Sequence, residues 1–135
     1  MVNMLVYFFA FVMLAGAVGH IVVPDFYAAL IPAPIPKAFA NGLAAVVEGL
    51  IGVGLLLPRL RRLSGLAFTL LMIAFVPLHI WDALKEAPMV GSHTAAIVRL
   101  IIQALLIAGG VAVYRSQRHS RPMSSNAPST VSKGG

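Results

Sequence analysis

The feature that most constrains this chain is a series of four apolar stretches, which cover residues 3–22, 38–57, 63–84 and 94–114. A helix of about 20 apolar residues crosses the hydrocarbon layer of a bilayer. Because the bilayer core offers no water to exposed backbone groups, each stretch must be helical to cross it. The chain is 59% hydrophobic and 10% charged, too apolar for the polar surface of a soluble domain. The sequence therefore predicts an all-α integral membrane protein.

The connections between these stretches predict how the helices are arranged. All are short, which favours an up-down four-helix bundle. In the first connection, residues 23–38, Phe26, Tyr27, Leu30 and Ile31 are spaced like a short amphipathic turn. They predict a short interfacial helix in the first outer loop, followed by an extended segment rich in proline. Glycines in the first, second and fourth stretches predict close helix contacts. We expect a four-span membrane domain over residues 1–115 and a disordered basic cytoplasmic tail over residues 116–135.

The basic residues predict the topology. Seven of the ten Lys and Arg residues lie in the second connection or after the fourth stretch. They are Arg59, Arg61, Arg62, Arg115, Arg118, Arg121 and Lys133. Positive charge favours the cytoplasmic side, so we expect both termini inside and a bacterial-type inner (plasma) membrane location. With the charge placed this way, the predicted partner is the lipid bilayer and not nucleic acid.

Polar residues within the apolar stretches are the best functional signal. Glu48 lies eleven residues after Lys37, which is roughly 16 Å along a helix and near the centre of the bilayer. A carboxylate at that depth must be protonated or paired, and Arg99 enters from the same side, so we expect a Glu48–Arg99 ion pair. The residues predicted to line a polar, outward-facing pocket are His20, Glu48, His79, Asp82, Arg99 and Gln103.

Two interpretations of this polar cluster remain open. It could bind a ligand or handle protons, or the Glu48–Arg99 pair could simply hold the helices together. Pro77 is expected to open the third helix near its end. The chain has no cysteine, which excludes disulfides and thiolate metal sites. We expect no metal site, because histidines at helix ends usually bond to backbone or carboxylate groups, and the chain contains no catalytic constellation.

The order of several motifs resembles that of the DoxX-like family of small four-span membrane proteins. These motifs are GHIVVPDFYAALIPAPIP (19–36), VVEGLIGVGLLLPRLRRLSG (46–65), FVPLHIWDAL (75–84) and VRLIIQALLI (98–107). The resemblance covers residues 10–115 and implies that His20, Glu48 and Arg99 occupy the family's typical polar positions. Many relatives carry Asn where this chain has His79, which implies hydrogen bonding and not metal ligation there. Namesake members are membrane subunits of a thiosulfate:quinone oxidoreductase.

From the polar cluster and this resemblance we expect an auxiliary or anchor subunit of a quinone-linked redox system. It would bind a small lipid-soluble ligand, with quinone as the candidate, and would not be an enzyme on its own. The expected partners are a redox protein and further copies of the chain. The alternatives are a non-enzymatic membrane scaffold and a small oligomeric transporter. Four spans are few for alternating access, so a transporter would have to oligomerise.

Overall fold

The computed structural model describes residues 2–89 and 91–117 and contains only helices within those ranges. The helices are α1 (Val2–Val22), α2 (Pro24–Ala28), α3 (Lys37–Leu56), α4 (Arg61–Ala83) and α5 (His93–Ser116). All but α2 are long and apolar enough to cross a membrane. The predicted all-α membrane bundle is therefore confirmed, and the protein is a multi-pass membrane protein. Residues 118–135 of the predicted tail lie outside the described ranges.

Local sequence explains where two of the helices begin. Pro24 occupies the first turn of α2, where its missing N–H would have no helical partner in any case. The side chain of Ser92 accepts a hydrogen bond from the backbone N–H of Ala95 at 3.2 Å and caps α5. The short helix expected in the first connection is thus present as α2.

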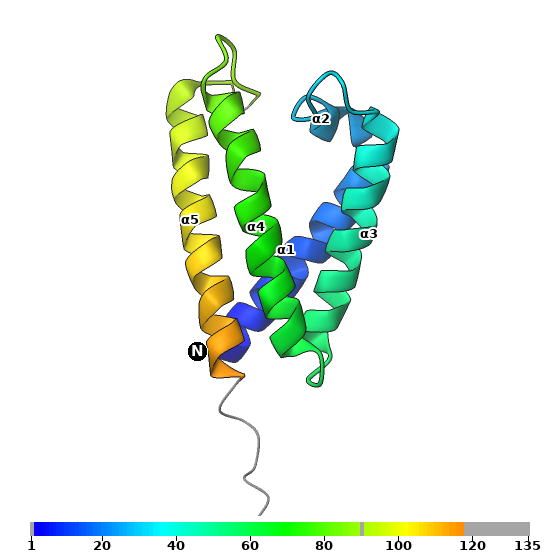
Figure 1. Cartoon of the computed structure of the whole chain (residues 1–135), viewed down its shortest axis with the longest axis vertical. Helices are drawn as coiled ribbons and strands as arrows, with labels where there is room; N and C mark the ends of the chain where they lie inside the picture. The colour runs from blue at the N-terminus through cyan, green and yellow to red at the C-terminus, as the bar shows by residue number, and fades with distance from the viewer. Residues whose placement is uncertain (1, 90, 118–135) are drawn as a thin grey trace, which may run out of the picture.

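The four long helices form two pairs, and α1 packs along α3 while α4 packs along α5. Figure 1 shows that the pairs converge at one end of the molecule and separate at the other, with α1 running obliquely behind. We call the converging end, with the start of α1, the α3–α4 turn and the end of α5, the closed half. The other end, with α2, the end of α4 and the start of α5, is the open half.

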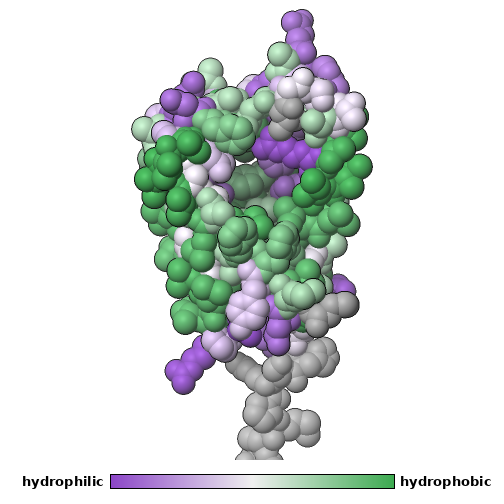
Figure 2. All heavy atoms as spheres, turned by 180° about the vertical axis from the view of Figure 1, so that it is seen from behind, coloured by the Kyte–Doolittle hydropathy of each residue, from purple (hydrophilic) through white to green (hydrophobic). Residues whose placement is uncertain are grey.

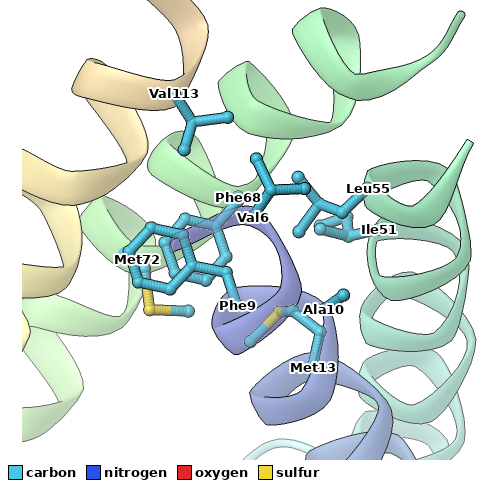
Figure 3. Close-up of a cluster of buried hydrophobic side chains, with 9 residues drawn as sticks. All are labelled: Val6, Phe9, Ala10, Met13, Ile51, Leu55, Phe68, Met72 and Val113. Atoms are coloured by element: carbon cyan, nitrogen blue, oxygen red, sulfur yellow. The ribbon is translucent and has the colours of Figure 1, made fainter. Parts of the chain in front are cut away.

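Buried apolar side chains fill the closed half (Figure 3). Every long helix contributes to this core, which consists of Val6, Phe9, Ala10, Met13, Ile51, Leu55, Phe68, Met72 and Val113. The rings of Phe9 and Phe68 stack with their centroids 4.5 Å apart. Water does not drive helices together within lipid, so this interdigitated packing is what holds the two pairs to each other.

Glycines permit the close helix contacts in this half. A Cβ on Gly110 would lie 2.8 Å from Cδ1 of Phe68, and one on Gly52 would lie 3.3 Å from the carbonyl oxygen of Ala10. Neither position could carry a larger residue without moving its neighbours. Gly42 differs from the expectation, because a Cβ there would meet no atom within 4 Å.

A polar cavity in the open half

A cavity of about 450 Å³ occupies the space between the two helix pairs in the open half. Its volume falls within the range of small-molecule sites. All four long helices line it, together with Tyr27 of α2 and Leu30 and Ile31 after it. Figure 2 shows the open half hollowed on one side, with hydrophobic and hydrophilic atoms inside and hydrophobic atoms on both flanks. Met13 and Met72 belong to both the core and the cavity lining, so they form its floor.

The structure brings five of the six predicted pocket residues to this cavity. The five that line it are His20, Glu48, His79, Arg99 and Gln103. Asp82 is absent from the lining and only 1% exposed. Asp82 instead contacts the lining residue Arg99, whose Nη1 lies 3.6 Å from Oδ2 of Asp82. Asp82 is thus the counter-ion of a lining residue.

The wall formed by α1 and α3 carries a connected set of polar groups. Nε2 of His20 lies 3.5 Å from Oε1 of Glu48, and Nδ1 of His20 lies 3.0 Å from Oδ1 of Asn41. Asn41 in turn donates from Nδ2 to the carbonyl oxygen of Pro24 at 3.0 Å. The set therefore runs from the middle of the membrane helix α3 to the start of α2.

The surroundings of this set fix its position. Glu48 and Asn41 are both almost fully buried. The carboxylate of Glu48 lies against Gly16, where any side chain would displace it. The ring of Tyr27 covers His20 with 3.9 Å between ring centroids. These neighbours hold His20 and Glu48 facing the cavity.

The opposite wall, formed by α4 and α5, carries a different set centred on Asp82. Oδ1 of Asp82 accepts hydrogen bonds from Nζ of Lys85 and from the backbone N–H of Met89, each at 3.2 Å. Oδ2 faces Arg99. Lys85 also donates to the carbonyl oxygen of Ala29 at 3.2 Å, which links the end of α4 to the segment after α2.

Two nitrogen atoms on this second wall have no hydrogen-bond partner within the part of the chain that the structure describes. They are Nη1 of Arg99 and Nδ1 of His79, and both are shielded from solvent. Both residues line the cavity. Nη1 of Arg99 faces Oδ2 of Asp82 in an ion pair that is longer than a hydrogen bond. Buried polar groups are normally paired, so Nδ1 of His79 is the atom on this wall that is left to bind a ligand.

The expected Glu48–Arg99 ion pair is wrong, because Glu48 pairs with His20 and Arg99 pairs with Asp82. Counting residues along the helices places Glu48 and Arg99 at similar depth, but it does not say which helices are neighbours. In the structure α3 packs along α1 and α5 packs along α4. Glu48 and Arg99 therefore each take a partner from their own helix pair.

Pro77 lies inside α4, which continues through it from Arg61 to Ala83. A proline removes the hydrogen bond to the carbonyl four residues earlier, here that of Ile73. Nε2 of Gln103 donates to the carbonyl of the preceding residue, Met72, at 2.5 Å. Gln103 therefore bonds the carbonyl next to the one that Pro77 frees, and its side chain is buried at the floor of the cavity.

Sequence reasoning did not include Asn41 and Tyr27 among the pocket residues. Asn41 follows the same face of α3 as Glu48, since seven residues are nearly two helical turns, and that spacing was the available signal. Tyr27 gave no such signal, because its position depends on how the first connection folds back over His20. Within residues 2–89 and 91–117, no group of three His, Asp or Glu side chains could hold a metal ion.

The comparisons with known proteins identify a family without a function. Residues 9–114 match the model of a family described as a domain of unknown function, DUF8561. No curated protein and no solved structure matches the sequence. The matched region runs from the core of α1 almost to the end of α5 and includes every residue of both cavity walls. The chain therefore belongs to the DUF8561 family.

Proposed function

We propose that this protein is a membrane-embedded binding subunit for a lipid-soluble ligand, with the quinones as the ligand class, in a quinone-linked redox system. The cavity between the helix pairs carries the proposal. It is large enough for a quinone head group, mostly apolar, and lined by a few converging polar groups. The hollow lies in the side of the molecule, where lipid would surround it (Figure 2).

The arrangement of polar groups supports an amphipathic ligand. Nδ1 of His79 has no hydrogen-bond partner among the described residues and could bind an oxygen of the head group. Arg99, which pairs with Asp82 at 3.6 Å, adds a cation to the same wall. Apolar side chains such as Val12, Phe75 and Leu78 line other parts of the cavity and would contact the ring or tail. In this proposal the chain binds and orients the ligand, and a partner protein carries out electron transfer.

The motif order and the charge distribution support the finer points of the proposal. The resemblance to the DoxX-like family, which includes quinone-linked subunits, favours a quinone over other lipid-soluble ligands. The basic residues Arg59, Arg61 and Arg62 lie at the same end as the end of α5. This favours a cytoplasmic closed half and an open half at the outer surface of a bacterial-type inner membrane.

The direct test is to purify the full chain in nanodiscs and titrate it with decylubiquinone and menadione. We expect saturable binding, and we expect quinone among the lipids that mass spectrometry identifies in protein purified from native membranes. Ala44→Phe should abolish binding because Ala44 lines the cavity. Val46→Phe is the matched control, since Val46 is exposed on the same helix. Recovery of bulk phospholipid alone, with no saturable binding of either quinone, would contradict the proposal.

A structural role is the second candidate, because both buried carboxylates already have partners within their own helix pairs. A scaffold would need these pairs only for stability. In that case Glu48→Gln would lower the thermal stability and leave the activity of any partner complex intact at a permissive temperature. If the substitution instead reduced quinone binding while the protein stayed folded, the purely structural role would be excluded.

A further inference from the structure

The hydrogen bonds of Asn41 determine which ring nitrogen of His20 carries a proton. The carbonyl oxygen of Pro24 can only accept, so the NH₂ group of Asn41 must face it. Oδ1 of Asn41 then faces Nδ1 of His20, and because that oxygen can only accept, Nδ1 must carry a hydrogen. The tautomer of His20 thus follows from the bonding pattern.

The contact on the other side of the ring then requires a proton. Nε2 of His20 and Oε1 of Glu48 face each other at 3.5 Å. With Nδ1 protonated, Nε2 is either an acceptor that needs a protonated Glu48, or the second N–H of an imidazolium that faces a carboxylate. Both arrangements contain one proton between the two side chains and have no net charge. An arrangement without that proton would leave a buried carboxylate beside an acceptor, which is costly within a membrane.

We infer that His20 and Glu48 form a one-proton exchange site on the α1/α3 wall that exchanges a proton with an oxygen of the bound ligand. Both residues line the cavity, and Gly16 leaves room for the carboxylate there. The inference rests on the proposed function, because it concerns the ligand of the same cavity. It narrows the ligand class to lipid-soluble molecules with an oxygen that gains and loses a proton, such as the head group of a quinol.

The exchange conserves charge and atoms without any electron transfer. When a ligand hydroxyl gives its proton to the pair, the pair gains a second proton and one positive charge, and the ligand oxygen becomes an anion. In the reverse direction the ligand oxygen recovers its proton and the pair returns to its neutral state. The positive charge gained by the pair balances the ligand anion, and Arg99, which pairs with Asp82 at 3.6 Å, adds a cation to the lining of the same cavity.

Other titratable groups surround the pair on each helix that lines the cavity. Tyr27 contributes from α2, His79 from α4 and Arg99 from α5. Among them only Tyr27 contacts His20 in the described structure, through its ring. The protonation of His20 and Glu48 should therefore be measured directly on these two side chains. The pH dependence of binding alone would also include the neighbouring groups.

The first test uses the protein without added ligand, so it is independent of the proposed function. Full-length protein with ¹⁵N-labelled histidine is examined by NMR in nanodiscs. The infrared difference spectrum between the unsubstituted protein and Glu48→Gln identifies the carboxyl band of Glu48. We expect Nδ1 of His20 to be protonated, and Asn41→Leu to remove this preference. A His20 ring protonated only at Nε2 would overturn the inference. Gly49→Ala is the control, since a Cβ there makes only an ordinary contact, and it should leave the spectra unchanged.

The second test adds decylubiquinol and decylubiquinone. Binding should shift the Nε2 signal of His20 and the carboxyl band of Glu48, and Glu48→Gln should weaken quinol binding by about tenfold, as expected for loss of one strong hydrogen bond. Suppose that Nδ1 of His20 is protonated and the quinol binds saturably, but the signals of His20 and Glu48 do not shift on binding. This result would overturn the proton exchange and leave the proposed function intact. If Nδ1 of His20 is protonated but neither decylubiquinol nor decylubiquinone binds, the proposed function is overturned as well.

Discussion

The closed and open halves of the molecule are built from the same four helices but are held together by different means. In the closed half, apolar side chains from both helix pairs interdigitate. In the open half, the ion pairs His20–Glu48 and Asp82–Arg99 each join helices of one pair. Lys85 bonds to the carbonyl of Ala29 on the other side, but the two ion pairs do not cross the gap between the helix pairs, and a cavity remains there.

This difference separates the half that stabilises the fold from the half that contains the cavity of the proposed ligand. Packing within lipid depends on close, complementary surfaces, and the closed half supplies them. The open half keeps its two ion pairs apart on two walls, which leaves a cavity between them. Substitutions in the two halves should accordingly affect different measurements.

The largest expected effect is that of Phe68→Ala. Phe68 is completely buried and stacks on Phe9 across the two helix pairs, so its loss should lower the free energy of unfolding by roughly 3–5 kcal/mol. Unfolding by titration with a denaturing detergent measures this. Phe11→Ala, at a lipid-facing position, should have little effect. Equal effects of the two substitutions would show that the closed half is not the stabilising one.

Asp82→Ala should have the largest effect within the open half. It removes the counter-ion of Arg99 and the acceptor for Lys85 and Met89. Breaking a buried pair by removing one partner costs about 3 kcal/mol. Thermal unfolding in detergent should show this loss, whereas Asp25→Ala, at an exposed position, should leave the midpoint unchanged. An unchanged midpoint for Asp82→Ala would mean that the α4/α5 wall is solvated in the folded protein.

Gly110→Ala should have an intermediate effect, a loss of roughly 2 kcal/mol through overpacking against Phe68 and Thr69. The matched control is Gly42→Ala, where a Cβ meets no atom. That substitution should be neutral or slightly stabilising, because alanine restricts the unfolded chain. The same unfolding assay compares both variants. A loss at Gly42 as large as that at Gly110 would indicate that helix contacts extend into the open half.

The smallest expected effect on stability is that of Lys85→Met. Lys85 links Asp82 on α4 to the carbonyl of Ala29, but it is partly exposed, so the free energy of unfolding should fall by less than about 1 kcal/mol. Its effect should appear instead as faster amide hydrogen exchange in the segment after α2. Lys37→Met provides the control at the start of α3. No change in exchange would show that Lys85 does not connect the two walls in solution.

Much of this fold could be predicted from the sequence because the bilayer imposes a simple length and polarity requirement. The four predicted stretches correspond to α1, α3, α4 and α5 within a few residues, and the spacing of the aromatic and aliphatic residues from Phe26 to Ile31 predicted the short helix in the first connection. The helical rise also placed Glu48 and Arg99 at similar depth, and both line the cavity.

What could not be predicted was the choice of neighbours. The four long helices are all similarly apolar, so hydropathy does not indicate which of them pack together. It therefore cannot predict whether Glu48 lies against α1 or α5. That choice depends on small residues such as Gly16 and Gly52, which let α1 and α3 approach closely. The burial of Asp82 behind Arg99 follows from the same pairing of α4 with α5.

The hollow in the side of the molecule has a consequence for how the affinity for the proposed ligand would be expressed. A ligand that enters from the surrounding lipid is dissolved in the bilayer and not in water, so its relevant concentration is a mole fraction of lipid. Adding more detergent or lipid at constant ligand would dilute it and weaken apparent binding, although no contact in the cavity has changed. Two laboratories could thus obtain different constants for one site and agree once both count ligand molecules per lipid.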